Sequence, residues 1–127
     1  MTPEAQQLID DLRALDGPSR EMDARLSVYS GFYLDGQVQG SAIVFSDGEV
    51  CYSNKYTASI DAALTLIPDG WTIWSVINEV DIKTYSAYLV KMEFSGPKTA
   101  GHHNKSIPIA ILIAAIKASE ADKDKTP

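Results

Sequence analysis

The segment 107–116, Ile-Pro-Ile-Ala-Ile-Leu-Ile-Ala-Ala-Ile, constrains the fold more than any other part of the chain. Ser106 is placed to cap a helix here, with Pro108 in its first turn. Isoleucine and leucine cover nearly every side of that helix, and a helix that is apolar all round is buried all round. The run is too short to span a bilayer. Because one sheet covers only one side, we expect the N-terminal helices or a second subunit to cover the other.

The remaining segments predict three further helices and two pairs of strands. Helices are expected at 3–15 after a Thr2 cap, from 18–19 onward, and at 60–67 after a Ser59 cap. Strands are expected at 41–45, 49–53, 71–80 and 84–94, with a hairpin turn at Asp47-Gly48 and a second turn near Asp81. Residues 30–39 are expected to form a loop or an irregular edge strand. Residues 95–105 are polar and glycine-containing, which predicts a surface loop.

This order of elements predicts the α+β class. Short links between neighbouring strands indicate a mainly antiparallel four-stranded sheet, with helices on one or both faces as in an α/β/α sandwich. A length of 127 residues fits a single domain, which we place at 1–120, followed by a charged and frayed tail at 121–127.

Charge and cysteine content exclude several classes of function. The formal net charge of −6 argues against general binding of nucleic acids, which needs a basic face. A single cysteine, Cys51, forms neither an internal disulfide nor a cysteine-based zinc site. The polar N-terminal segment shows no signal peptide, so we expect a cytoplasmic protein without a membrane partner.

Three segments resemble a known family. Residues 17–23, Gly-Pro-Ser-Arg-Glu-Met-Asp, are similar to the Gly-x-x-Arg-Glu-Leu-Asp opening of small phage and prophage proteins. Residues 56–64 resemble their central Tyr-Ser/Thr-x-x-Leu/Ile-x-Ala-Ala helix start, and 106–118 resemble their closing Thr-x-Pro helix, with Ile where that helix often has Cys. The family is the phage ABA sandwich domain, whose members are mostly uncharacterised. The resemblance implies a sheet between two helical layers, a phage or prophage origin and an accessory role in the bacterial host. It assigns no catalytic residues.

A candidate anion site precedes the closing helix. Positive or polar side chains gather there next to free backbone N–H groups, a combination that favours phosphate or a nucleotide: Lys98, His102, His103, Lys105 and Ser106. The alternative is a flexible surface loop. The start of the third helix offers similar chemistry at Ser59, with Tyr56 as a possible stacking ring, or is simply a capped helix with a core aromatic. Adjacent histidines lack the spacing of a metal site, so we expect no metal and no cofactor.

The aromatic strands and the motif inventory leave three functions open. Core packing is the expected role of Trp71, Trp74, Tyr85 and Tyr88, with a ligand-stacking floor as the alternative. No phosphate loop, nucleophile elbow or metalloprotease motif is present, which disfavours catalysis. The leading hypothesis is a phage-encoded, non-enzymatic binding protein, a counter-defence sponge that sequesters a small anionic or nucleotide-like signal. The alternatives are an oligomeric structural or protein-interaction module, and a hydrolase of a phosphorylated signal that uses His102 or His103.

Overall fold

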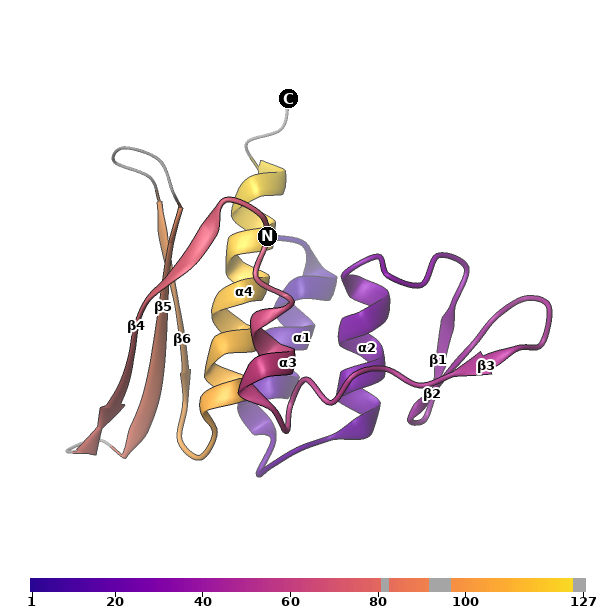
Figure 1. Ribbon diagram of the computed structural model, residues 1–127, viewed down its shortest axis with the longest axis horizontal. Helices are drawn as coiled ribbons and strands as arrows, with labels where there is room; N and C mark the ends of the chain where they lie inside the picture. Colours follow the sequence, from indigo (N-terminus) through magenta and orange to yellow (C-terminus); the bar gives the residue numbers. More distant parts are fainter. Residues whose placement is uncertain (81–82, 92–96, 125–127) are drawn as a thin grey trace.

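The computed structural model describes residues 1–80, 83–91 and 97–124, and places a layer of helices between two antiparallel sheets (Figure 1). The α+β class and the antiparallel pairing are confirmed, but the single four-stranded sheet is wrong, because the strands form two separate sheets of three. The layers therefore run sheet, helices, sheet and differ from an α/β/α sandwich. Predictions for the turn at 81, for strand residues 92–94, for loop residues 95–96 and for the tail at 125–127 lie outside the described residues.

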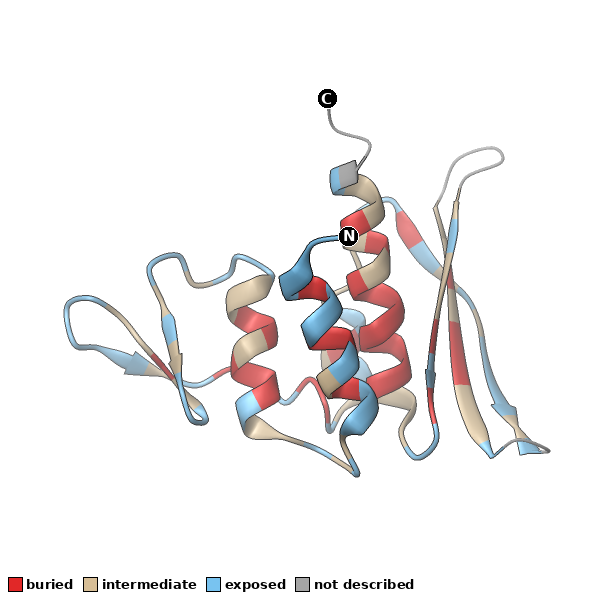
Figure 2. Ribbon diagram, turned by 180° about the vertical axis from the view of Figure 1, so that it is seen from behind, coloured by how far each residue is buried: buried red, intermediate tan, exposed pale blue. Residues whose placement is uncertain are grey.

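Helix α4 (Ile107–Asp124) occupies the centre of the molecule. It contacts β5 and β6 of one sheet on one side and helices α1 and α3 on another. Every residue from Ile109 to Ile116 is buried, and Figure 2 shows this buried stretch between the sheet and the other helices. The expectation of a helix sealed on all sides is confirmed, and within this single chain the N-terminal helices supply the second cover.

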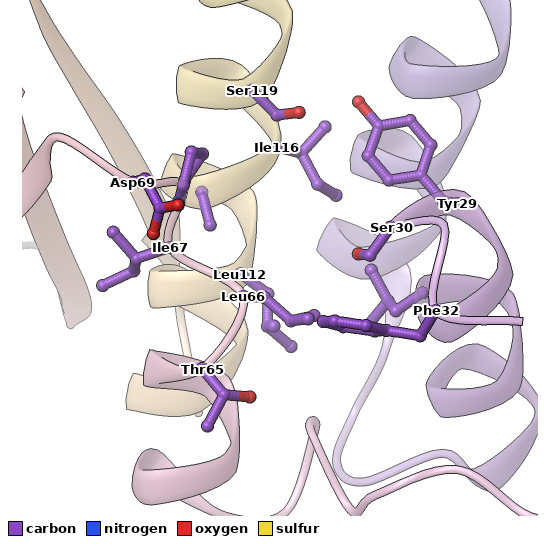
Figure 3. Close-up of a pocket in the computed structure, with 13 residues that line it drawn as sticks. Tyr29, Ser30, Phe32, Thr65, Leu66, Ile67, Asp69, Leu112, Ile116 and Ser119 are labelled. Carbon is purple, nitrogen blue, oxygen red and sulfur yellow. The ribbon is translucent and has the colours of Figure 1, made fainter.

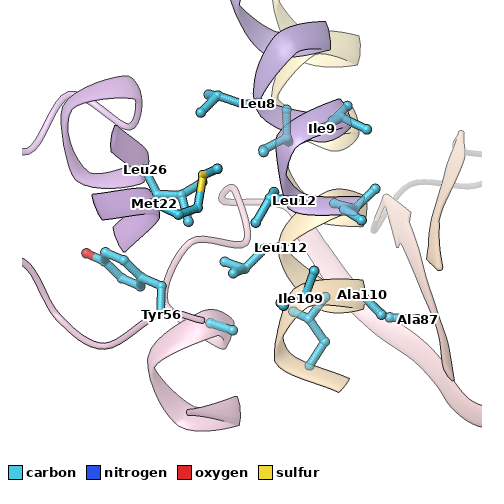
Figure 4. Close-up of a cluster of buried hydrophobic side chains, with 14 of the residues drawn as sticks. Leu8, Ile9, Leu12, Met22, Leu26, Tyr56, Ala87, Ile109, Ala110 and Leu112 are labelled. Atoms are coloured by element: carbon cyan, nitrogen blue, oxygen red, sulfur yellow. The ribbon is translucent and has the colours of Figure 1, made fainter. Parts of the chain in front are cut away.

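Three shorter helices complete that cover, and each follows a hydroxyl cap. They are α1 (Pro3–Ala14), α2 (Arg20–Tyr29) and α3 (Ile60–Leu64). The caps at Thr2 and Ser59 were predicted, whereas for the second helix only the start at 18–19 was. The hydroxyls of Thr2, Ser19 and Ser59 accept hydrogen bonds from backbone N–H groups three residues on, at 3.1–3.2 Å. The buried faces of α1 and α2 meet α4 in one hydrophobic cluster (Figure 4).

The large sheet has the order β4–β5–β6, formed by β4 (Trp71–Glu79), β5 (Thr84–Lys91) and β6 (Lys98–His103). Strand β6 corrects the predicted polar loop over 98–103. Its inward side chains are polar because they bond to helix backbone: the Thr99 hydroxyl donates to the Ala114 carbonyl at 2.9 Å. Gly101 is required, since a Cβ atom there would lie 1.9 Å from the carbonyl oxygen of Ala110.

The small sheet has the order β1–β2–β3, from β1 (Gln37–Gln39), β2 (Ala42–Val44) and β3 (Val50–Cys51), and packs beside α2. The predicted hairpin turn is confirmed, with Gly48 at a φ of 88°. Strand β1 lies inside the segment 30–39, for which a loop or an irregular edge strand was predicted, and it is an edge strand of this sheet. Only Ile43 of this sheet is fully buried.

Two further comparisons concern the third helix and the chain end. Helix α3 ends at Leu64, before the predicted end at 67, and Ile60 and Leu64 remain partly exposed while Ala63 is buried. Helix α4 continues through the charged residues to Asp124. The Asp122 carboxylate accepts hydrogen bonds from Trp71 Nε1 at 3.0 Å and from Lys91 Nζ at 2.6 Å. Among the helices of the described chain, none combines the length and apolar character that a membrane crossing requires.

Candidate functional site

The structure distributes the predicted site residues over several places. Lys98 and His102 lie on the outer face of β6, the side away from α4. His103, the next residue along the strand, points inward, because successive side chains of a strand alternate between its faces. Lys105 and Ser106 directly precede α4, and Ser59 caps the N-terminus of α3. The proposed single cluster is therefore not formed.

His103 has a structural role. Its side chain is buried, and its Nε2 lies 2.8 Å from the carbonyl oxygen of Leu15, while its Nδ1 accepts a hydrogen bond from the Lys105 backbone N–H at 3.1 Å. These contacts join the end of β6 to the end of α1. Both ring nitrogens are occupied by the protein itself, so His103 presents no group to a ligand.

Tyr56 is a core residue. It is only 2% exposed and belongs to the same hydrophobic cluster as Met22 and Leu26 (Figure 4). The ring is therefore not available to stack on a base, and its alternative reading as a core aromatic holds.

A shallow hollow of about 760 Å³ does bring together Ser59, Lys105 and Ser106. It is a poor match for an anion because Asp16 and Asp61 also line it. The Lys105 ammonium already pairs with the Asp16 carboxylate at 3.1 Å. The hydroxyls of Ser59 and Ser106 are used as helix caps. The positive charge expected here is thus compensated locally.

The outer face of the large sheet is the more distinctive surface. In the register of the strands it carries Ser75, Ser86, Tyr88, Lys98, Ala100 and His102. No element of the described chain covers this face, whereas α4 covers the opposite one. An uncovered sheet face with aromatic residues is a candidate binding surface.

Trp74 dominates this face. It sits at a register shift between Ile73 and Ser75, where a β-bulge re-aims a side chain, and the residue is 69% exposed. The Lys98 ammonium lies 5.3 Å from the centroid of that ring, so the two side chains meet across β5. Together with Ser75 and Tyr88 they line a small hollow of about 250 Å³.

A chain of hydrogen bonds borders the same face. The buried Ser86 hydroxyl donates to Glu79 Oε2 at 2.8 Å and lies 2.7 Å from His102 Nδ1. The Tyr88 and His102 rings meet edge to face with centroids 6.0 Å apart. Residues on three strands thus fix the His102 ring, while its residue remains exposed.

A different kind of cavity, about 370 Å³, lies between α2, the segment 65–69 and α4 (Figure 3). Its lining combines apolar side chains, such as Phe32, Leu66 and Ile116, with polar ones, among them the carboxylate of Asp69. This cavity contains none of the predicted binding residues.

Glu120 organises a polar cluster with Tyr29, one of the residues that line that cavity. It is 2% exposed and accepts hydrogen bonds from the Thr2 backbone N–H, the Thr2 hydroxyl and the Tyr29 hydroxyl at 2.7–2.8 Å. Burial alone would raise the pKa of Glu120, but these bonds and Lys123 outweigh it and lower the pKa to about 2. Burial, together with the Glu120 bond, raises the pKa of Tyr29. The cluster ties three segments together and leaves its groups fully engaged.

The described residues were also compared with the requirements of a metal site. Within residues 1–80, 83–91 and 97–124, no group of three or more His, Cys, Asp and Glu side chains is arranged to hold a metal ion. The outer sheet face offers instead an aromatic ring, an ammonium group and an imidazole, which suit stacking, an anion and a hydrogen bond.

The fold and this surface define the chain as an α+β protein with one open, aromatic sheet face. Scans against protein-family models, curated proteins and solved structures each gave no match. The resemblance to the phage ABA sandwich domain therefore stays a prediction.

Proposed function

We propose that this chain is a non-enzymatic binding protein that holds a small, planar, anionic ligand of the nucleotide type on the outer face of the large sheet. The observation that carries the proposal is Trp74, exposed beside the Lys98 ammonium on a sheet face that the described elements leave uncovered. If the chain has the phage origin that its resemblance implies, capture of such a ligand would sequester a signal of the host.

The chemistry of the face supports a ligand with both a ring and a negative charge. Stacking on an aromatic side chain contributes about 1–3 kcal/mol per base and tolerates different bases. Lys98 supplies the cation for a phosphate next to the stacked ring. The overall charge of −6 repels long nucleic acids, so a small ligand fits this surface better than a polymer.

The burial and hydrogen bonding of Ser86 favour capture of the ligand over its hydrolysis. Ser86 carries the hydroxyl closest to His102, yet the residue is fully buried and the hydroxyl is bonded to Glu79. A nucleophile needs access to the ligand as well as an adjacent base. Recovery of the ligand unchanged after long incubation supports capture, and release of a hydrolysis product supports the hydrolase alternative.

Isothermal titration with nucleoside monophosphates, cyclic nucleotides and cyclic ADP-ribose isomers tests the proposal. We expect binding that Trp74→Ala and Lys98→Ala each weaken at least tenfold. Lys105→Ala is the matched control, because it removes a lysine from the other hollow. Absence of heat with every ligand overturns the proposal, as does binding that is lost in Lys105→Ala and retained in Lys98→Ala.

A second function, a protein-interaction module, is favoured by the edge strand β4. This strand is nine residues long, exposes Val76 and Ile77, and among the described strands pairs only with β5. A long apolar edge is a template for pairing with another strand, for example β4 of a second copy. Native mass spectrometry should then show a dimer that Ile77→Lys dissociates and Val50→Lys, on the small sheet, does not. A wild-type monomer at high concentration rules this function out.

A further inference from the structure

The two adjacent histidines carry their ring protons on different nitrogen atoms. In His102 the proton position follows from the contacts of Ser86. Ser86 Oγ lies 2.8 Å from Glu79 Oε2 and 2.7 Å from His102 Nδ1. A hydroxyl has one proton, and an ionised carboxylate only accepts hydrogen bonds. The Ser86 proton therefore goes to Glu79, and His102 Nδ1 must be the donor to Ser86.

His103 is held in the opposite tautomer. Its Nε2 faces the Leu15 carbonyl oxygen, which only accepts, so Nε2 carries the proton. Its Nδ1 accepts from the Lys105 backbone N–H and is therefore unprotonated. Because neighbouring side chains of a strand point to opposite faces, the two rings have different partners and therefore different tautomers.

The consequence for His102 is a bare Nε2 on the open face. A neutral imidazole has one ring proton, and here Nδ1 holds it. The edge-to-face contact with Tyr88, with the rings at 81°, fixes the plane of the ring. An exposed imidazole held in this way offers a hydrogen-bond acceptor of fixed direction.

We infer that His102 is a specificity-determining residue that selects ligands with an N–H donor, such as the amino group of an adenine-type base. Ser86 and Glu79 are positioning residues that act through the His102 tautomer. Lys98 and His102 are four residues apart on one strand face, roughly 13 Å, which matches an extended nucleoside monophosphate with its phosphate at Lys98. This inference rests on the proposed function.

The tautomers are measured first, without any ligand. A two-bond ¹H–¹⁵N correlation spectrum at a pH of about 8.5, where an ordinary imidazole is neutral, should show Nδ1–H for His102 and Nε2–H for His103. Glu79→Gln, which keeps the shape of the side chain but can donate to Ser86, should shift His102 toward Nε2–H and leave His103 unchanged. An Nε2–H tautomer for His102 in the wild type overturns the inference.

Ligand selection is measured second, with adenosine 5′-monophosphate and purine riboside 5′-monophosphate, which lacks the amino group. We expect the wild type to prefer the amino compound roughly three- to tenfold, the worth of one hydrogen bond. Ser86→Ala should remove the preference without weakening purine riboside monophosphate. Equal wild-type affinities overturn the inference while the proposed function stands. If neither compound binds while other nucleotides do, the inference also fails, and if no nucleotide binds, both fail.

Discussion

The two sheets have the same number of strands and the same antiparallel pairing, but they are stabilised very differently. The large sheet has strands of six to nine residues and packs Ala87 and Leu89, both fully buried, against α4. The small sheet has strands of two or three residues and a single fully buried side chain, Ile43. Short strands with little apolar surface are marginal on their own, so the small sheet depends on α2. The large sheet is stable enough to leave one face uncovered.

The largest test of this difference is Gly101→Ala. The new Cβ atom would lie 1.9 Å from the Ala110 carbonyl oxygen and 2.6 Å from the Ala114 nitrogen, both helix backbone that has no room to move. We expect the free energy of unfolding to fall by at least about 3 kcal/mol in urea denaturation. Gly17→Ala, with no atom within 4 Å of the new Cβ, is the control and should change little. Equal stability of the two variants would show that β6 does not pack on α4 as described.

The junction between the two regions should be nearly as sensitive. Asp23 is buried and accepts hydrogen bonds from the Thr57 N–H, the Thr57 hydroxyl and the Arg20 guanidinium at 2.8–2.9 Å. Asp23→Ala leaves these donors without their acceptor and should lower the free energy of unfolding by about 3 kcal/mol. Asp16→Ala, at an exposed pair, should cost less than about 0.5 kcal/mol. A loss under 1 kcal/mol for Asp23→Ala would contradict the role of this junction.

The third test uses pH and addresses only the helical layer. The folded pKa of Glu120, about 2, lies below its ordinary value of 4.5, so the carboxylate stabilises the fold above about pH 4.5. That stabilisation is lost as the pH falls toward 2. We expect Glu120→Gln to be about 2 kcal/mol less stable than the wild type at pH 7 and equally stable near pH 2. A difference that does not vary with pH would refute this assignment.

The smallest expected effect is local to the small sheet. Ile43→Val removes one buried methylene group and should lower the opening free energy of amides in β1–β3 by about 1 kcal/mol. Amides of α4 should keep their protection in hydrogen exchange, because they open with the packed body. Equal loss of protection in α4 would mean that the two sheets unfold as one cooperative unit.

Local features of the fold were predictable from the sequence, and pairings over long distances were not. Hydroxyl caps, a glycine turn and an apolar helix act over a few residues, so Thr2, Ser59 and the run 107–116 predicted their elements correctly. The assignment of strands to two sheets depends on contacts between distant segments. Strand β6 was missed because its inward polar groups bond to helix backbone, a partner that a hydropathy pattern does not reveal.

Of the candidate site, only the polar residues on β6 were predicted as binding residues. Lys98 and His102 stood out as part of a lysine- and histidine-containing segment in an acidic chain, but Trp74, Ser86 and Glu79 come from two other strands. Trp74 had been expected in the core because aromatic residues usually pack there, and the register shift beside it is not evident in the sequence. The alternative of a ligand-stacking floor describes its exposure better.

The position of α4 in the chain has a consequence for biosynthesis. This helix follows every element against which it packs, so a ribosome releases both sheets and three helices before the segment that joins them emerges. Until then the apolar faces of α1, α2 and β5 lack the cover that α4 provides, and exposed apolar surface of this kind favours aggregation of the nascent polypeptide. We therefore expect the fold to be completed late and in nearly one step. That step is the packing of the apolar helix α4, and the structure does not grow stepwise from the N-terminus.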